Sequence, residues 1–314
     1  MRTPAAIALS AAIVLAGLAA LAGLSFVGYR AMQGPLKTES QKNRGGDMTE
    51  SAQRALQPHQ AALAATVRAK RELIPQPWAG DELLASKLGG RAYWPAGQPF
   101  PATADGTPMT LLAQIDLAEA AMPGYPQHGL LQFFISAGDF YGAGLDGPME
   151  MEALAEPHGF RVVYWPQPLS ADAAPVPEPR PGDFLPFDPT RPRRILFAAG
   201  EETIGANDAG FEQVAGASVD EIATRYASAN GLPQDEVSDA LYESLERFGH
   251  KLGGHPDFTQ SDPRAPGGGW LLLLQLDSDD QMMWGDSGVA NFFIRQQDLV
   301  RADFSRVAFH WDCY

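Results

Sequence analysis

Three short segments of this chain each occur twice, in the same order and at nearly constant spacing. The pairs are KLGG at 87–90 and 251–254, LAQID and LLQLD at 112–116 and 273–277, and GLLQFFI and GVANFFI at 129–135 and 288–294. Their offsets are 164, 161 and 159 residues, which is far longer than the period of about 20–50 residues typical of solenoids. The sequence therefore predicts one domain made of two related halves.

Most of the repeated sequence has the pattern of β-strands. The chain has 32 Gly and 26 Pro, which favour turns, and 45% hydrophobic residues, which are enough for a folded core. Apolar and aromatic runs predict strands at 111–117, 129–136, 160–165, 194–198, 271–276, 289–294 and 307–311. Helices are predicted at 218–230 and 235–248. We expect a β-rich α+β fold, with two pseudo-symmetric halves of mainly antiparallel strands and a few helices.

The N-terminal segment is uncharged for 27 residues between Arg2 and Arg30. About 20 apolar residues suffice to span a bilayer as a helix, so residues 4–29 predict a transmembrane anchor. The alternative is a signal peptide cleaved near Ala22, but the apolar run is longer than such peptides usually have. Lys and Arg are more frequent after the segment than before it. This favours a single-pass inner-membrane protein with a cytoplasmic body, the alternative being a periplasmic or secreted one.

These features divide the chain into three parts. Residues 1–30 form the anchor or signal peptide, and residues 31–80 a polar tether and a helical spacer, with helix expected over 48–73. The duplicated domain follows at 81–314. Within it we expect a first half at 81–170, a Pro-rich and helical insert at 171–244, and a second half at 245–314.

Charge is unevenly distributed along the chain. Residues 1–72 have a net charge of +5, whereas the remainder has a net charge of −20. Nucleic-acid phosphates require a basic surface, so the acidic body argues against nucleic acid. A basic protein or peptide would be a compatible partner, and solubility alone is the other explanation. The single cysteine, Cys313, excludes an intrachain disulfide.

The repeated motifs also resemble those of a bacterial protein family. Residues 87–95 and the LLAQIDL strand resemble the front half of the YwqG-like family, a domain of unknown function. In the second half, GGHP at 253–256, MWGDSG at 283–288 and the terminal WDC at 311–313 are similar to the same family. The resemblance covers about residues 82–314. It implies a duplicated, β-rich α+β fold without an established activity. Some members look like immunity proteins encoded beside toxins, which implies binding rather than catalysis.

Polar residues at matching places in the two halves are candidate ligand-binding residues. Gln114 and Asp116 share one strand face, as do Gln275 and Asp277, because side chains alternate along a strand. Gln132 and Asn291 lie at matching places on the next strand. If the halves face each other, these groups line one symmetric polar cleft. The alternative is a structural network, since buried polar groups are normally hydrogen-bonded.

Trp284 and Asp286 complete the candidate set, because an aromatic residue beside a carboxylate can form a recognition surface. The same segment contains GDSG at 285–288, as serine proteases do. A nucleophilic serine needs a base and an orienting acid, however, and the repeat aligns Ser287 with His128 in a turn. Neither a zinc motif nor a phosphate loop is present, so we predict no catalytic residue, metal or cofactor.

The sequence thus predicts a membrane-anchored, non-catalytic binding domain that recognises a protein or peptide in the manner of an immunity protein. The alternative is a small-ligand sensor or an enzyme that uses the symmetric polar cleft.

Overall fold

A computed structural model of the chain describes residues 39–80, 82–145, 147, 149–166, 174–182 and 184–314. The predicted anchor at 4–29 lies outside these residues. Within the described part, no helix combines the length and apolar character needed to cross a membrane.

Ten strands form one antiparallel sheet in the order β10-β9-β8-β7-β1-β6-β2-β3-β4-β5. The strands are β1 (Arg68–Pro77), β2 (Lys87–Leu88), β3 (Thr110–Asp116), β4 (Leu130–Ile135), β5 (Phe160–Trp165), β6 (Arg193–Glu202), β7 (Lys251–Gly253), β8 (Trp270–Asp277), β9 (Val289–Arg295) and β10 (Val307–Asp312). Each strand from β1 to β5 has an equivalent five places later in the chain, from β6 to β10. If every strand is replaced by its equivalent, the same order results, read from the opposite edge of the sheet. The two sets are therefore pseudo-symmetric repeats, which we call the first repeat (β1–β5) and the second repeat (β6–β10).

The register of the strands reproduces the sequence duplication. A β-bulge interrupts the β3–β4 ladder between Leu111 and Ala113, and another interrupts the β8–β9 ladder between Leu272 and Leu274. The two bulges differ by 161 residues, which is the offset of the repeated strand. The predicted β-rich α+β fold of mainly antiparallel strands is confirmed. The two repeats are wider than the predicted halves at 81–170 and 245–314, because β1 and β6 lie outside those ranges.

Of the two central strands, β6 confirms the strand predicted at 194–198, whereas the prediction for β1 is wrong. The sequence predicts helix as far as Leu73, but residues 68–77 form β1, which pairs with β6 and β7. Of this strand only Leu73 is buried, so its sequence lacks the apolar alternation by which strands are recognised. Strand β1 is stabilised by pairing with β6, which is distant in the chain, so local sequence does not reveal it.

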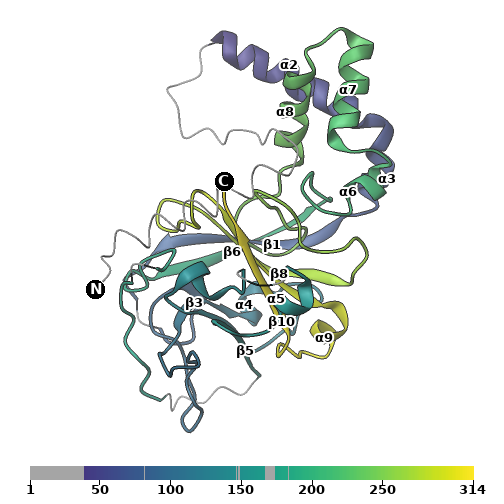
Figure 1. Cartoon of the computed structure of the whole chain (residues 1–314). Coiled ribbons are helices and arrows are strands. Elements are labelled where there is room, and N and C mark those ends of the chain that lie inside the picture. The colour runs from purple at the N-terminus through teal and green to yellow at the C-terminus, as the bar shows by residue number, and fades with distance from the viewer. Residues whose placement is uncertain (1–38, 81, 146, 148, 167–173, 183) are drawn as a thin grey trace, which may run out of the picture. The chain divides into compact units, whose positions relative to one another are not determined.

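Short helices connect or flank the strands, and three longer ones form a separate group. They are α2 (Glu39–Leu56), α3 (Gln60–Ala64), α4 (Leu117–Ala120), α5 (Met151–Leu154), α6 (Phe211–Ala215), α7 (Val219–Asn230), α8 (Gln234–Leu245) and α9 (Gln296–Val300), with 3-10 turns at Gln57–His59 and Asp139–Gly142. A capping box between Ser218 and Glu221 begins α7. Helices α2, α7 and α8 pack on one another around a core of their own (Figure 1).

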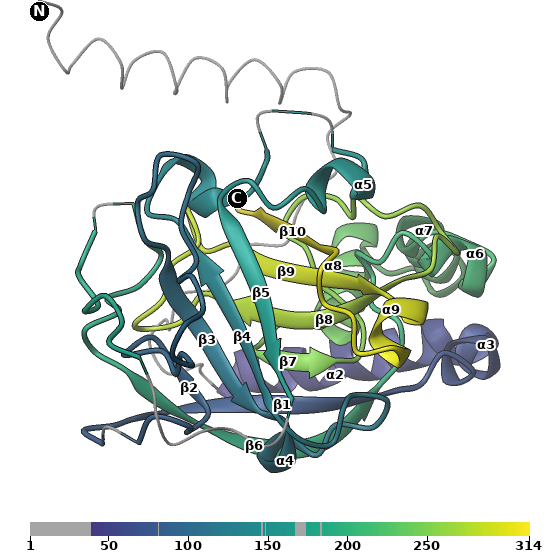
Figure 2. The same cartoon turned by 90° about the horizontal axis from the view of Figure 1, so that it is seen from below.

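The sheet is strongly curved and nearly closed, and its inner face encloses the main core. The edge strands β5 and β10 lie close to each other (Figure 2). Phe160 of β5 contacts Phe309 of β10, with ring centroids 5.4 Å apart. Phe292 stacks on Phe309 and meets Phe133 edge-to-face. Both repeats therefore contribute aromatic rings to one shared core.

Candidate functional site

The amide side chains of the two repeats lie on the outer face of the sheet rather than in a shared cleft. Ala113 and Ile115 belong to the inner core, and Gln114 alternates with them, so its side chain points the other way. Gln275 has the same relation to its neighbours Leu274 and Leu276. The structure therefore does not bring the two amide sets together.

Each glutamine instead forms the same set of hydrogen bonds in its own repeat. The Gln114 side chain donates to the carbonyls of Leu83 and Ala85 and accepts from the N–H of Tyr93, at 2.8–3.1 Å. Gln275 donates to Arg247 and Gly249 and accepts from Asp257, at 2.8–2.9 Å. Every partner in the second set lies 164 residues after its equivalent in the first.

The neighbouring candidates on β4 and β9 complete these networks. The amide of Gln132 donates to the Tyr93 carbonyl, and that of Asn291 donates to the Asp257 carbonyl, both at 2.8 Å. All four amide side chains are fully buried. Their shared arrangement holds the chain segments before and after β2, or before and after β7, against the sheet. This is the structural network expected as the alternative to a polar cleft.

The carboxylates on the same strands hold local backbone. Asp116 accepts from the N–H of Ala118 and caps α4. Asp277 accepts from the N–H groups of Gly249 and Ser278, at 2.9 and 2.7 Å. Both carboxylates thus accept hydrogen bonds from backbone N–H groups of the protein.

The remaining two candidates, Trp284 and Asp286, differ in their exposure to solvent. Trp284 is fully buried and packs against Tyr141 and Phe309, so it belongs to the core and not to a recognition surface. Asp286 is exposed on the turn that contains Ser287. Ser287 has a φ of 61°, as the predicted turn allows.

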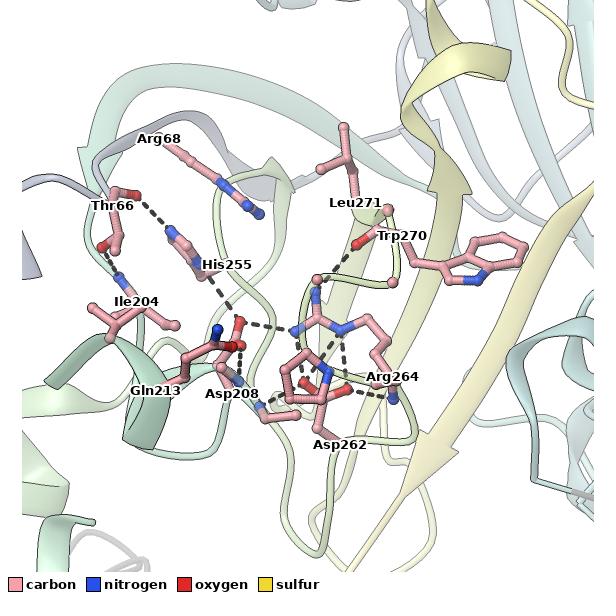
Figure 3. Close-up of a pocket in the computed structure, with 18 of the residues that line it drawn as sticks. Thr66, Arg68, Ile204, Asp208, Gln213, His255, Asp262, Arg264, Trp270 and Leu271 are labelled. Atoms are coloured by element: carbon pink, nitrogen blue, oxygen red, sulfur yellow. Dashed lines mark hydrogen bonds and ion pairs between the residues drawn. The ribbon is translucent and has the colours of Figure 1, made fainter. Parts of the chain in front are cut away.

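A pocket of about 490 Å³ opens beside the second repeat, and of its ionisable lining residues one, His255, lies in the GGHP motif at 253–256. Its walls are the segment leading into β1, the loop from β6 into α6, and the loop before β8. Four ionisable side chains form its base, and we call them the charged network: Asp208, His255, Asp262 and Arg264 (Figure 3). Their side chains are between 2% and 9% exposed, so the charges are withdrawn from water.

Arg264 is the centre of the charged network. Its guanidinium lies 2.8 Å from the Asp208 carboxylate and 2.6 Å from that of Asp262, and it also donates to the Trp270 carbonyl. The guanidinium carbon lies over the Phe293 ring, 5.2 Å from the centroid. Burial alone lowers the pKa of Arg264, but the two carboxylates outweigh it and raise the pKa.

His255 connects the network to the segment before β1. Its Nε2 donates to the carbonyl of Thr66 at 2.8 Å, and its Nδ1 lies 3.5 Å from the Asp208 carboxylate. Burial raises the pKa of Asp208, but hydrogen bonds from His255 and Arg264 outweigh it and hold that pKa well below its usual range. Asp208 is therefore ionised at neutral pH.

The first repeat has a pocket at the equivalent place, with different chemistry. That pocket measures about 390 Å³ and is lined by Phe100, Met109 and the Pro-rich segment at 177–182, which includes the charged residues Glu178 and Arg180. Phe100 lies against Phe134, with centroids 5.5 Å apart, as Arg264 lies over the equivalent Phe293. We call the two sites the apolar pocket and the charged pocket, after Phe100 and Arg264. The fold thus fills this position with a phenylalanine in one repeat and an arginine in the other.

Metal binding finds no support in the described residues, which contain no group of three or more His, Cys, Asp or Glu placed to hold an ion. Asp279, which follows β8, instead accepts hydrogen bonds from Arg193 and His250, at 2.5 and 2.8 Å.

Comparison with protein families assigns the chain to a family. Residues 86–313 match the family described as Domain of unknown function (DUF1963), so the chain belongs to that family. No curated protein matches the chain. The matched region begins just before β2 and includes the His255, Asp262 and Arg264 positions of the charged pocket, together with the Asp208 position.

Proposed function

We propose that this protein is a YwqG-like, non-catalytic binding domain whose ligand site is the charged pocket. The main support is the contrast between the two repeats. A buried ion network gains little net stability over apolar packing, because each charge loses its hydration. The first repeat packs Phe100 where the second has Arg264, so the fold itself does not require the charges.

The lining supports binding rather than catalysis. Thr66 supplies the one hydroxyl group among the described residues that line the pocket, and its Oγ1 donates to the Leu63 carbonyl and accepts from the Ile204 N–H. The His255 ring is directed to Thr66 and Asp208. An activated nucleophile needs a base within hydrogen-bonding reach, and these groups are committed to the protein.

The test is retention of small molecules by the full chain. The protein is equilibrated with a small-molecule cell extract, and the compounds that remain bound are identified by mass spectrometry. Gln213→Trp fills the pocket from an exposed position on its wall, and Glu212→Trp places the same side chain on the adjacent exposed position outside the lining. We expect a compound retained by the wild type and Glu212→Trp and lost from Gln213→Trp. Equal retention by both variants, or no retained compound, would contradict the proposal.

We further propose that residues 4–29 attach this domain to the inner membrane, with the body in the cytoplasm. The support is the 27-residue uncharged run and the excess of Lys and Arg that follows it. The intact mass of the protein extracted from washed membranes tests the anchor. Retention of residues 1–22 in that protein supports it, and a chain that begins after Ala22 contradicts it.

A further inference from the structure

The groups of the charged network are bonded within the protein. Arg264 pairs with the carboxylates of Asp208 and Asp262, and the Nε2 of His255 donates to the Thr66 carbonyl. Backbone also satisfies the carboxylates, since Asp208 accepts from the Gly210 N–H and Asp262 from the Ala209 N–H. The guanidinium of Arg264 at the base of the pocket is therefore already paired.

Arg68 is the exception among the charged lining residues. It begins β1, lines the charged pocket and is exposed to solvent. Within the described part of the chain, its guanidinium has no hydrogen bond or ion pair, whereas Arg264 has several. Figure 3 shows the Arg68 side chain reaching over the pocket, without a contact to the network below. One cation is thus available to a ligand.

The other polar groups around the opening are uncharged. Gln213 of α6 and Gln296 of α9 offer amides, and the loop Gly267–Gly269 brings backbone to the pocket wall, where the Gly268 carbonyl already accepts from Arg295. Gly267 and Gly269 have positive φ values of 72° and 77°, which a glycine adopts without strain. This surface suits amide or hydroxyl groups on the body of a ligand.

Resting on the proposed function, we infer that the charged pocket takes a small monocarboxylate with a polar, uncharged body, and that Arg68 binds its carboxylate. A guanidinium matches a planar carboxylate with two parallel hydrogen bonds. One cation balances one negative charge. A phosphate dianion would need a second cation, and Arg264, the other arginine of the lining, is already paired with Asp208 and Asp262. The volume of about 490 Å³ lies within the range of small-molecule sites.

A matched pair of probes tests this inference on the full chain. N-acetylglycine has a carboxylate and an amide, and N-acetylglycinamide has the same shape without the charge. Binding is measured from the fluorescence of the chain, since Trp270 lines the pocket, and by calorimetry. Loss of a charge-assisted pair corresponds to about 10- to 100-fold in affinity. We expect N-acetylglycine to bind the wild type at least about 10-fold more tightly than N-acetylglycinamide does.

Two variants assign the effect to Arg68. Arg68→Gln keeps a polar side chain without charge and should weaken N-acetylglycine binding by about 10- to 100-fold. Arg225→Gln removes an exposed arginine of α7, whose partner is Glu221, and should leave binding unchanged. Far-ultraviolet circular dichroism of both variants checks that the fold is retained.

Three outcomes overturn the inference: equal binding of both probes, unchanged binding by Arg68→Gln, or tighter binding of inorganic phosphate than of N-acetylglycine. These outcomes are distinct from failure of the proposed function. A compound from the extract that depends on an open pocket but not on Arg68 overturns the carboxylate assignment and leaves the binding site in place.

Discussion

Removing the Arg264 charge tests whether the buried ion network is needed for the stability of the fold or is dispensable for it. Arg264→Met keeps an unbranched side chain over Phe293 but leaves the carboxylates of Asp208 and Asp262 without their guanidinium, in positions no more than 9% exposed. Breaking a buried pair by removing one partner costs about 3–5 kcal/mol. We expect a loss of this size in the free energy of unfolding at about pH 7.

The triple variant Asp208→Asn, Asp262→Asn, Arg264→Met removes all three charges together. The asparagine carbonyls still accept from Gly210 and Ala209, so the backbone hydrogen bonds of the loop are retained. Replacing a whole buried ion network by neutral groups is often close to neutral for stability. We therefore expect the triple variant to recover most of the stability that Arg264→Met loses, although it no longer has the charged network.

Urea denaturation followed by fluorescence and circular dichroism measures both variants against the wild type. The deficit of Arg264→Met should also shrink as the pH falls below about 5, because the unpaired carboxylates then bind protons. A triple variant no more stable than the single one would refute the view that the charges are dispensable for the fold. A loss below about 1 kcal/mol for Arg264→Met would refute the view that Arg264 compensates two buried carboxylates.

Three further predictions concern the repeats and the buried groups around them. Gln275→Met removes three buried hydrogen bonds and should cost about 3–5 kcal/mol in urea denaturation. Gln114→Met should cost a similar amount, and a change below about 1 kcal/mol in either would contradict the structural role. Burial raises the pKa of Asp312 to about 6, so its folded-state pKa exceeds its unfolded value. Its stabilising contribution is therefore complete below about pH 3.8 and is lost as the pH rises through about 6. The wild type should lose up to about 3 kcal/mol relative to Asp312→Asn between about pH 4 and 7, and parallel pH profiles would contradict this. A Cβ at Gly142 would lie 2.0 Å from the Gly159 carbonyl, whereas one at Gly97, also with positive φ, meets no atom within 4 Å. Thermal unfolding should therefore show a much larger loss for Gly142→Ala than for Gly97→Ala, and equal losses would show that backbone conformation alone matters.

Strands β3, β4, β8 and β9 are predictable because their sequences are apolar and occur as repeated motifs. The duplicated motifs alone identify β3 as the equivalent of β8 and β4 as the equivalent of β9, and both pairs have equivalent places in the sheet. Strand β1 is not predictable in this way. Its charged sequence is exposed along most of its length, and its pairing with β6 depends on contacts between residues far apart in the chain.

The candidate site shows a similar division. The repeat draws attention to Gln114 and Gln275, and the structure shows that they have equivalent structural partners. Apart from His255 in the GGHP motif, the residues of the charged network come from separate loops that no motif relates, so the sequence does not predict that they meet. One signal is present in the sequence: the two repeats differ at the positions of Phe100 and Arg264. Positions at which the two repeats differ are therefore more informative about the binding site than positions at which they agree.

An amide and indole nuclear magnetic resonance titration of the full chain with N-acetylglycine tests most directly whether the charged pocket is the binding site. We expect chemical-shift changes at Gly267–Gly269 and the Trp270 indole, with none at Phe100 and Met109 of the apolar pocket. Arg68→Gln should abolish these changes. Changes centred on the apolar pocket, or no change at the glycine loop at saturating probe, would contradict the assignment of the site.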